Sequence, residues 1–291
     1  MTSPPIDPAA MPIRPQSWYS GLLDTTTSDR FDPSVPHPAR VYAYWLGGKD
    51  HYLADRKAAE EVIRRRPQVV VGARANRAFL ARVVRYLAGE RGIRQFLDIG
   101  TGLPAPGSTH EVAQAVAPSC RVVYVDDDPL VLVHARALLT SNPQGSCDYV
   151  AADLRDTLAV LAGASQTLDL SQPTAVLLLA VLHFIPDTDD PASVVAALAS
   201  KLAPGSFLAI SHLTADFAPD SVTAGVRAYN ALVPTALTSR SHSQVSALFA
   251  GLPLVPPGVV PLTEWRPAAV GQFPYAADLY AGVAHAPAPR F

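Results

Sequence analysis

Short apolar segments alternate with segments of helical periodicity through the middle of this chain. The apolar segments predict five strands, near residues 95–99, 121–125, 147–151, 175–179 and 207–210. Helices are expected between them, near residues 108–117, 129–140, 154–161 and 191–202. Apolar strands that alternate with helices are typical of a parallel sheet covered on both faces. The pattern therefore predicts a doubly wound, Rossmann-like α/β fold.

The pattern continues beyond the fifth strand without a second domain of comparable size. Two further helices are expected near residues 221–232 and 243–249. Two final strands are expected near residues 251–255 and 279–284. Such a pair would close one edge of the sheet, so we expect seven strands that are mostly parallel.

The segment before the first strand predicts helices only. A short helix around Val41 to Leu46 ends at Gly47-Gly48, and longer helices follow over 53–66 and 69–88. We expect residues 39–90 to form a cap over the core at 91–291 and to fold with it as one unit. Residues 1–38 contain eight prolines, which predicts a proline-rich arm without continuous regular structure.

Composition narrows the class of protein. Of 291 residues, 49% are hydrophobic and 16% charged, which fits a globular protein with a large core. The formal net charge of -2 gives no positive field for a nucleic-acid backbone, so no nucleic-acid partner is expected. A charged leader and an apolar run of about 18 residues are both absent, so we expect a cytoplasmic protein without a membrane partner. The sequence leaves open whether the chain forms a homodimer.

The two cysteines, Cys120 and Cys147, lie in apolar, strand-like surroundings. No C-x-x-C or histidine-rich spacing accompanies them. We therefore expect two reduced, buried thiols and no metal site.

Polar residues follow the predicted strands, where ligands bind in sheets of this kind. Asp98 closes the first strand, and Gly100-Thr101-Gly102 lets the backbone bend and approach a ligand. After the second strand, Asp126 is placed to accept both hydroxyls of a ribose, with Asp127 as a secondary candidate. Asp128 precedes Pro129 and is expected to cap the next helix.

The third and fourth strand ends add two more candidate groups. Asp153 could accept a hydrogen bond from an adenine amine while Leu154 offers an apolar surface to the ring, although Asp153 could equally cap a helix. The fourth strand ends in the polar-containing segment 180–184.

Two cofactors compete for this site. Residues 100–105 can be matched to G-x-G-x-x-A, with an acid about twenty residues on, as in dinucleotide-binding proteins. Pro104 and Pro106, however, disturb the turn where a pyrophosphate would need free N–H groups. Asp98 suits a ligand with a cationic amine better than one with phosphates.

Several motifs together resemble the class I S-adenosylmethionine-dependent methyltransferases. They are Leu97-Asp-Ile-Gly-Thr-Gly102, Val123-Tyr-Val-Asp126, Ala152-Asp153 and Leu182-His-Phe-Ile-Pro-Asp187. More closely, Pro38 to Asp50, Arg74-Ala-Asn-Arg-Ala-Phe79 and Ile99 to Pro104 are similar to a family known as S-adenosyl methyltransferases, most of whose members lack an assigned substrate. The similarity covers residues 35–284.

The resemblance implies S-adenosyl-L-methionine as cofactor and a role for each motif. Asp98, Gly100, Thr101 and Gly102 would surround its methionine part, Asp126 its ribose, and Asp153 with Leu154 its adenine. Ala180, Val181 and Leu182 would line the methyl-donor side. The helices around Tyr42, Gly47, Gly48 and Lys49 would close over the cofactor, and Lys49 or Arg40 could pair with its carboxylate.

Methyl transfer often needs a base, and His183 is the first candidate because it follows the fourth strand and its ordinary pKa is near 6.5. A histidine that merely packs there is the alternative, and His212, Tyr42 and His51 are weaker candidates. The fourth strand end lacks the Asn/Asp-Pro-Pro-aromatic motif of amino-methylating nucleic-acid enzymes, and the chain has no Pro-Cys nucleophile.

We therefore expect a methyltransferase acting on a small molecule or natural-product intermediate, at O, N or C. A binding protein for the same cofactor that performs no methyl transfer is the second hypothesis. A NAD-dependent oxidoreductase is the third.

Overall fold

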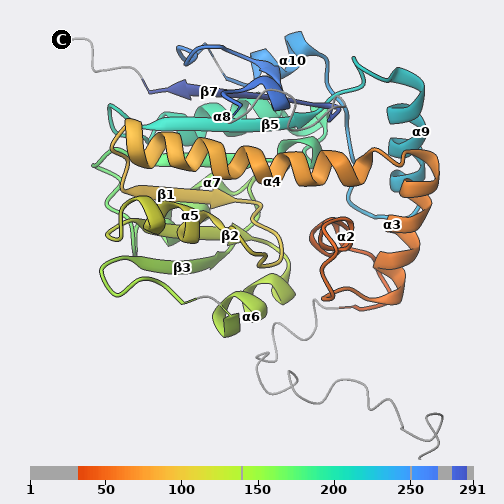
Figure 1. The fold of residues 1–291 in the computed structure, drawn as a ribbon, viewed down its shortest axis with the longest axis horizontal. Helices are drawn as coiled ribbons and strands as arrows, with labels where there is room; N and C mark the ends of the chain where they lie inside the picture. The colour runs from red at the N-terminus through yellow and green to blue at the C-terminus, as the bar shows by residue number, and fades with distance from the viewer. Residues whose placement is uncertain (1–31, 139, 250, 268–276, 287–291) are drawn as a thin grey trace, which may run out of the picture.

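A computed structural model describes residues 32–138, 140–249, 251–267 and 277–286 (Figure 1). Within them, seven strands form one sheet in the order β3-β2-β1-β4-β5-β7-β6. The strands are β1 (Gln95–Ile99), β2 (Arg121–Asp126), β3 (Ser146–Ala151), β4 (Ala175–Leu179), β5 (Phe207–Leu213), β6 (Val260–Pro261) and β7 (Leu279–His285). Strands β1 to β5 are parallel, and β7 pairs antiparallel with both β5 and β6. The predicted doubly wound α/β fold is confirmed.

Successive residues of a strand face opposite sides of the sheet, so apolar side chains lie on both faces. A layer of helices covers each face. Phe96 belongs to the cluster under α4 (Val69–Arg85) and α5 (Thr109–Val116). Its neighbour Leu97 belongs to the cluster under α7 (Thr157–Ala164) and α8 (Pro191–Ala199). Figure 1 shows α4 running along one face of the sheet, with α7 and α8 behind it. Helix α6 (Pro129–Leu138) packs against β2 and β3, and α10 (His242–Ala247) lies near β7.

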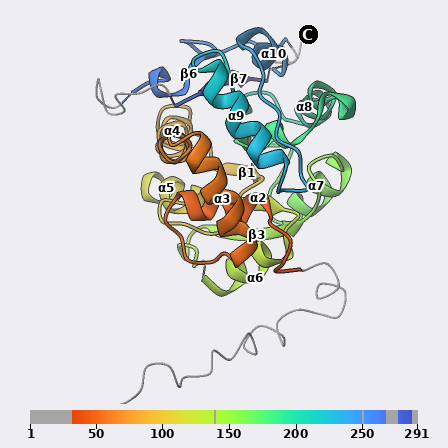
Figure 2. The same cartoon turned by 90° about the vertical axis from the view of Figure 1, so that its right-hand side faces the viewer.

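Three helices gather across one end of the sheet (Figure 2). They are α2 (Pro38–Trp45), α3 (Leu53–Arg65) and α9 (Pro219–Asn230). Buried Val41, Val62 and Tyr229 share one small hydrophobic cluster among them. Helix α4, which the sequence placed in the same cap, lies instead along the face of the sheet. The residues before the first strand thus contribute both to a helical layer and to the cover over the strand ends.

The prediction of a strand over 251–255 is wrong. Only Leu254 forms an isolated bridge, to Ala284, and the edge strand β6 lies further along the chain. Proline lacks the N–H that a strand ladder needs, and Pro253 and Pro256 flank this bridge. Both cysteines are free; Cys120 is buried, whereas Cys147 is only half-buried. In the described ranges, no helix combines the length and apolarity needed to cross a bilayer.

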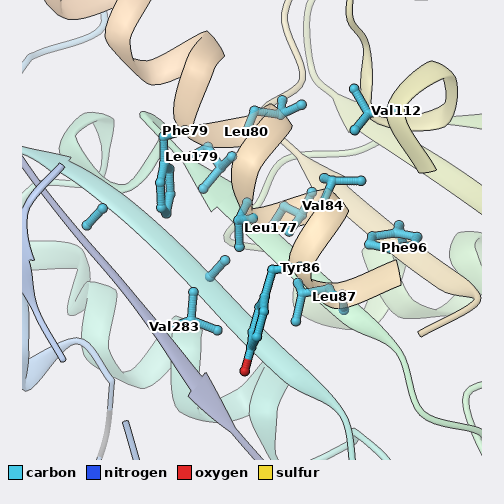
Figure 3. Packing of buried hydrophobic residues seen from close by; sticks show 14 of the residues in the cluster. Phe79, Leu80, Val84, Tyr86, Leu87, Phe96, Val112, Leu177, Leu179 and Val283 are labelled. Carbon is cyan, nitrogen blue, oxygen red and sulfur yellow. The ribbon is translucent and has the colours of Figure 1, made fainter. Parts of the chain in front are cut away.

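Helix α4 is held on the sheet by large side chains (Figure 3). Phe79 is fully buried, and its ring and that of Trp265 make a T-shaped contact with 5.4 Å between centroids. Arg82, one turn further along, donates hydrogen bonds to the carbonyls of Leu262 and Trp265. The short π-helix at Tyr86–Glu90 follows α4 and places the ring of Tyr86 against the same tryptophan. This packing fixes α4, which carries residues toward the carboxyl ends of the strands.

We expect Phe79→Ala to lower the free energy of unfolding by about 3–5 kcal/mol, because it leaves a cavity between α4 and Trp265. Leu158→Ala removes a side chain that is 74% exposed and should change it by less than about 0.5 kcal/mol. Urea denaturation of both variants checks this prediction. Equal losses in the two variants would show that the contact between α4 and the sheet is not a main source of stability.

Candidate active site

A cavity of about 480 Å³ lies at the carboxyl ends of β1 to β4, beside α2. Parallel strands end at the same edge of a sheet, so their following loops converge there. Most residues predicted to bind a cofactor line this cavity: Tyr42, Asp98, Gly100, Thr101, Gly102, Asp126, Asp127, Asp153, Leu154, Ala180 and Val181.

The two glycines of the turn after β1 are needed for different reasons. Gly100 has φ +72°, and a Cβ there would lie 2.3 Å from a methyl carbon of Val181. Gly102 has φ +65°, but a Cβ there would meet no atom within 4 Å. Gly100 therefore permits close packing against the loop after β4, while Gly102 leaves the backbone exposed to open space.

Asp98 is buried at the end of β1 and faces the cavity. One of its carboxylate oxygens accepts a 2.6 Å hydrogen bond from the hydroxyl of Thr109. Burial raises the pKa of Asp98 to about 6, against the hydrogen bond from Thr109 and the positive charge of Arg77, which lower it. A cationic group placed beside this carboxylate would favour its charged form.

Asp126 joins the end of β2 to the glycine turn. Its carboxylate accepts hydrogen bonds from the N–H of Gly102, at 2.8 Å, and from the N–H of Asp128, at 3.1 Å. Burial raises the pKa of Asp126 to about 6, although both hydrogen bonds lower it. A carboxylate has about four lone-pair positions, so two ligand hydroxyls could still bind it.

Four charged or titratable side chains, which we call the α2 anchor, connect α2 to the β2 loop: His37, Arg40, Asp55 and Asp128. His37 Nδ1 lies 3.1 Å from an oxygen of Asp128, and Arg40 Nε lies 3.5 Å from Asp55 and 3.7 Å from Asp128. The other oxygen of Asp128 accepts from the N–H of Leu130, as expected for a helix cap. Arg40 was a candidate partner for a cofactor carboxylate, but its side chain is buried among these acids.

Asp153 lies at the cavity with its charge already paired. Arg155 binds its carboxylate through both Nε and Nη2 and also reaches Asp189, at 3.2 Å. These contacts lower the pKa of Asp153, with the hydrogen bond from Arg155 as the largest cause. Asp153 does not cap the following helix, because Asp156 does.

Gly48 and Lys49, two predicted cofactor contacts, lie apart from the cavity. Both are exposed and neither belongs to its lining. Gly47, with φ +82°, turns the chain at the end of α2, and the N–H of Gly48 bonds back to the carbonyl of Ala43. Among the residues around this turn, it is Tyr42 that contacts the cavity.

His183 lies in a 3₁₀ turn, Leu182–Phe184, beside a second cavity of about 70 Å³ and not in the lining of the first. Burial is the largest cause that lowers the pKa of His183 well below its usual value, followed by the nearby His212 and Arg240. The ordinary value near 6.5, on which the choice of His183 as candidate base rested, therefore does not apply at this buried position.

The weaker histidine candidates differ in their surroundings. Both ring nitrogens of buried His212 have partners, the Leu213 carbonyl at 2.7 Å and Arg240 Nη1 at 2.8 Å. Burial lowers the pKa of His212 to about 4. His51 packs against the ring of Tyr44 and lies outside the lining of both cavities.

A buried hydrogen-bond chain joins the end of β4 to α2, and the sequence did not predict it. The N–H of Ala180 donates to Ser211 Oγ, Ser211 Oγ to Asn76 Oδ1, Asn76 Nδ2 to Tyr42 Oη, and Tyr42 Oη to the carbonyl of Ala73. Ala180 has φ +57°, a conformation that a non-glycine residue adopts only where its surroundings impose it.

Other lining residues were also missed by the sequence interpretation. They are His37, Arg77, Leu80, Phe184 and the segment 234–236. Arg77 and Asn76 lie in the motif at 74–79, so the motif marked them without giving their role. The segment after α9 carries no motif that could have revealed it. Among the described residues, no group of three or more His, Cys, Asp or Glu side chains could hold a metal ion.

The chain is similar to known proteins over most of its length. The model of a family described as S-adenosyl methyltransferase matches residues 24–287. A DUF574 family protein from Streptomyces avermitilis is 44% identical, with a TM-score of 0.84 over 88% of this chain and 99% of that one. A proposed methyltransferase from Thermobifida fusca is 38% identical, with a TM-score of 0.81 over 88% of this chain and 96% of that one. Among curated proteins, none matches the sequence.

The α2 anchor predicts a pH dependence of stability. Burial lowers the pKa of His37, but its 3.1 Å contact with Asp128 and the charges of Asp128, Asp126 and Asp127 outweigh burial and raise it. A raised pKa means that protonation of His37 stabilises the folded state. This contribution is complete below the pKa of His37 in the unfolded chain, about 6.5, and disappears as the pH rises through the higher pKa in the folded protein.

We therefore expect His37→Asn to cost about 1 kcal/mol of unfolding free energy near pH 6 and less as the pH rises. The difference between wild type and variant, measured by urea denaturation from pH 6 to pH 9, isolates this residue from other titrating groups. A difference that stays constant or grows with pH would contradict the proposed ionic contact between His37 and Asp128.

Proposed function

The chain belongs to the S-adenosyl methyltransferase family, and from this premise we propose that it methylates a small molecule at oxygen, nitrogen or carbon. Family membership gives S-adenosylmethionine as the cofactor, in place of the nicotinamide alternative left open by the sequence. The observation that carries the proposal is the pair of buried carboxylates, Asp98 and Asp126, in one cavity at the strand ends.

The cavity suits an S-adenosylmethionine molecule in its chemistry. That cofactor has an ammonium, a carboxylate, a sulfonium, a ribose and an adenine. The cavity has carboxylates for positive charge and hydroxyls, the guanidinium groups of Arg77 and Arg155, a glycine turn open to a ligand, and the apolar side chains of Leu80, Leu154 and Val181. Its volume of about 480 Å³ lies in the usual range for small-molecule sites.

Asp98 and Arg77 would hold the amino-acid end of the cofactor. Asp98 would accept from its ammonium, which would compensate the burial of this carboxylate. Arg77 lines the same cavity and anchors the turn through hydrogen bonds to the carbonyls of Ala105 and Pro106. Its guanidinium suits the cofactor carboxylate better than Lys49, which lies outside the lining, or Arg40, which belongs to the α2 anchor.

Asp126 would accept the ribose hydroxyls while still holding the N–H of Gly102. Asp127 extends from the same loop, but its side chain is 61% exposed, so we assign it a secondary role. Leu154 would contact the adenine ring. Asp153 would bind the adenine amine only in competition with Arg155, which already pairs with it.

When bound, S-adenosylmethionine supplies a methyl group whose bond to the sulfonium breaks as a bond to the acceptor forms, leaving a neutral thioether. An O–H, N–H or C–H acceptor also loses one proton. His183 remains our candidate to orient the acceptor or receive that proton, and its low pKa favours orientation, since a weaker base accepts a proton less readily.

Two observations support a small molecule over a polymer as acceptor. The net charge is -2, so no overall positive field attracts a nucleic acid. The second cavity, where His183 lies, is lined mainly by apolar side chains and measures about 70 Å³. A space of that size accepts a small organic group and not a folded polymer.

We expect Asp126→Asn to weaken binding of S-adenosylhomocysteine by about 10–100-fold, because hydrogen bonds to a charged group contribute about 1.5–3 kcal/mol. Titration calorimetry measures this loss. Asp220→Asn, the same change at an exposed position on α9, serves as the control and should leave affinity unchanged. Unchanged affinity in Asp126→Asn would remove this residue from the site.

The same titration should depend on pH. The pKa values of Asp98 and Asp126 are both raised to about 6, and only their ionised forms accept from an ammonium or two hydroxyls. Affinity should be constant above about pH 7 and fall by up to about tenfold per pH unit below pH 6 for each group. An affinity that rises on acidification would contradict the roles assigned to both acids.

The acceptor class is tested with cofactor carrying an isotopic label in its methyl group. Purified protein is incubated separately with a small-metabolite extract, total RNA, sheared DNA and total protein. We expect label only in small molecules, identified by mass spectrometry. Label that enters only a macromolecular fraction would overturn the proposed acceptor class while leaving the methyltransferase assignment in place.

A further inference from the structure

The second cavity, which we call the inner chamber, adjoins the cofactor cavity. Five residues line both: Pro38, Tyr42, Asn76, Ala180 and Phe184. They lie on α2, on α4 and at the end of β4, in the region where Figure 2 shows the helices gathered over the strand ends. Tyr42 and Asn76 are fixed there by their mutual hydrogen bond and by Ser211. These residues therefore form a fixed boundary that the two spaces share.

The walls of the inner chamber are apolar and belong to elements far apart in sequence. Trp45 comes from α2, Val62 from α3, Val226 from α9 and Leu279 from β7. Aromatic and aliphatic side chains of this kind favour an apolar ligand that loses its water on binding.

Two buried polar side chains of the chamber lack an intramolecular partner. His183 Nδ1 and Tyr229 Oη have no hydrogen bond, and their residues are 7% and 1% exposed. Both residues line the chamber, and Phe184 lies between them, with ring centroids 4.4 Å from His183 and 6.1 Å from Tyr229. An unpaired buried polar atom is costly, so a ligand that supplies the missing partner gains affinity there.

The charges around the chamber compensate each other. Arg66 lines it, and its Nε and Nη2 donate to one oxygen of Asp278 at 3.2 and 2.8 Å, both residues being buried. Arg240, which lies near His183, is bound by Asp187. A charged ligand would therefore lose its hydration without gaining an unpaired counter-charge.

We propose that the inner chamber and the adjoining edge of the cofactor cavity together bind the methyl acceptor, and that this acceptor is a small, uncharged molecule carrying a hydroxyl group. The hydroxyl pairs with His183 Nδ1 or Tyr229 Oη in the chamber, while the atom to be methylated lies at the shared boundary beside Tyr42 and Ala180. A hydroxyl both donates and accepts, so it suits either tautomer of the histidine. This inference rests on the proposed function, since it names the acceptor class of the same site.

Phenol and benzoate are matched probes, because they have similar rings and differ in charge at neutral pH. Binding of each is measured by ligand-observed NMR to the full chain saturated with S-adenosylhomocysteine. We expect phenol to bind at least about tenfold more tightly than benzoate. Equal affinities, or tighter benzoate binding, would overturn the proposal without any variant being made.

Tyr229→Phe and His183→Leu locate the site, because each removes one of the two unpaired polar atoms. The variant that loses the partner of the hydroxyl should weaken phenol binding about tenfold. Tyr44→Phe removes a hydroxyl on α2 that binds Glu60 outside the chamber and should have no effect. Unchanged phenol affinity in both chamber variants, with melting temperatures close to wild type, would overturn the assignment.

The cofactor titration keeps this inference separate from the proposed function. S-adenosylhomocysteine should bind the three variants as tightly as the wild type, since none of these residues lines the cofactor cavity. If the cofactor product binds and phenol does not, the chamber proposal fails and the proposed function stands. If the cofactor product fails to bind wild type, the proposed function fails, and phenol binding is then scored on the free protein.

Discussion

The carboxylate of Asp126 is the contact on which the site depends. It holds the N–H of Gly102 on one side and that of Asp128 on the other, so one buried acid fixes the ends of two adjacent strands. Burying a carboxylate is costly unless its oxygens are hydrogen-bonded. The backbone groups that satisfy Asp126 are those of the loops that it positions. The same atoms therefore order the site in the free protein and remain available to a ligand.

From Asp126 the network extends to the helices over the cavity. Asp128 caps α6 and also contacts His37, which stands immediately before α2, so the cover over the site is bound to the loop that carries Asp126. Arg40 and Asp55 extend this link to α3. Removing one member of a buried ionic group leaves the others unpaired, which destabilises more than the net strength of the contact suggests. The position of α2 is thus determined by electrostatics as well as by packing.

Features that depend on residues close together in the chain could be predicted from the sequence. Apolar strands, their order along the chain and the acids at their ends all follow from period and composition, and the turn at Gly100 to Gly102 could be located in advance. The burial of His183 could not, because it depends on α9 and on Arg240, which is 58 residues beyond the Leu182 carbonyl that it binds. The Arg66–Asp278 contact spans 212 residues and has no sequence signal. The prediction of a strand at 251–255 was wrong because it relied on the hydrophobic pattern and neglected the prolines of this segment.

The two cavities differ in their electrostatic character. The outer one carries carboxylates near the cofactor's expected cationic groups, whereas the inner one has its charges compensated and its walls apolar. In the proposed function, methyl transfer removes the sulfonium charge, so the outer cavity would attract the cationic cofactor and the inner one would suit an uncharged acceptor. Ala180, held at φ +57° by Ser211, places the end of β4 at the boundary between these two environments.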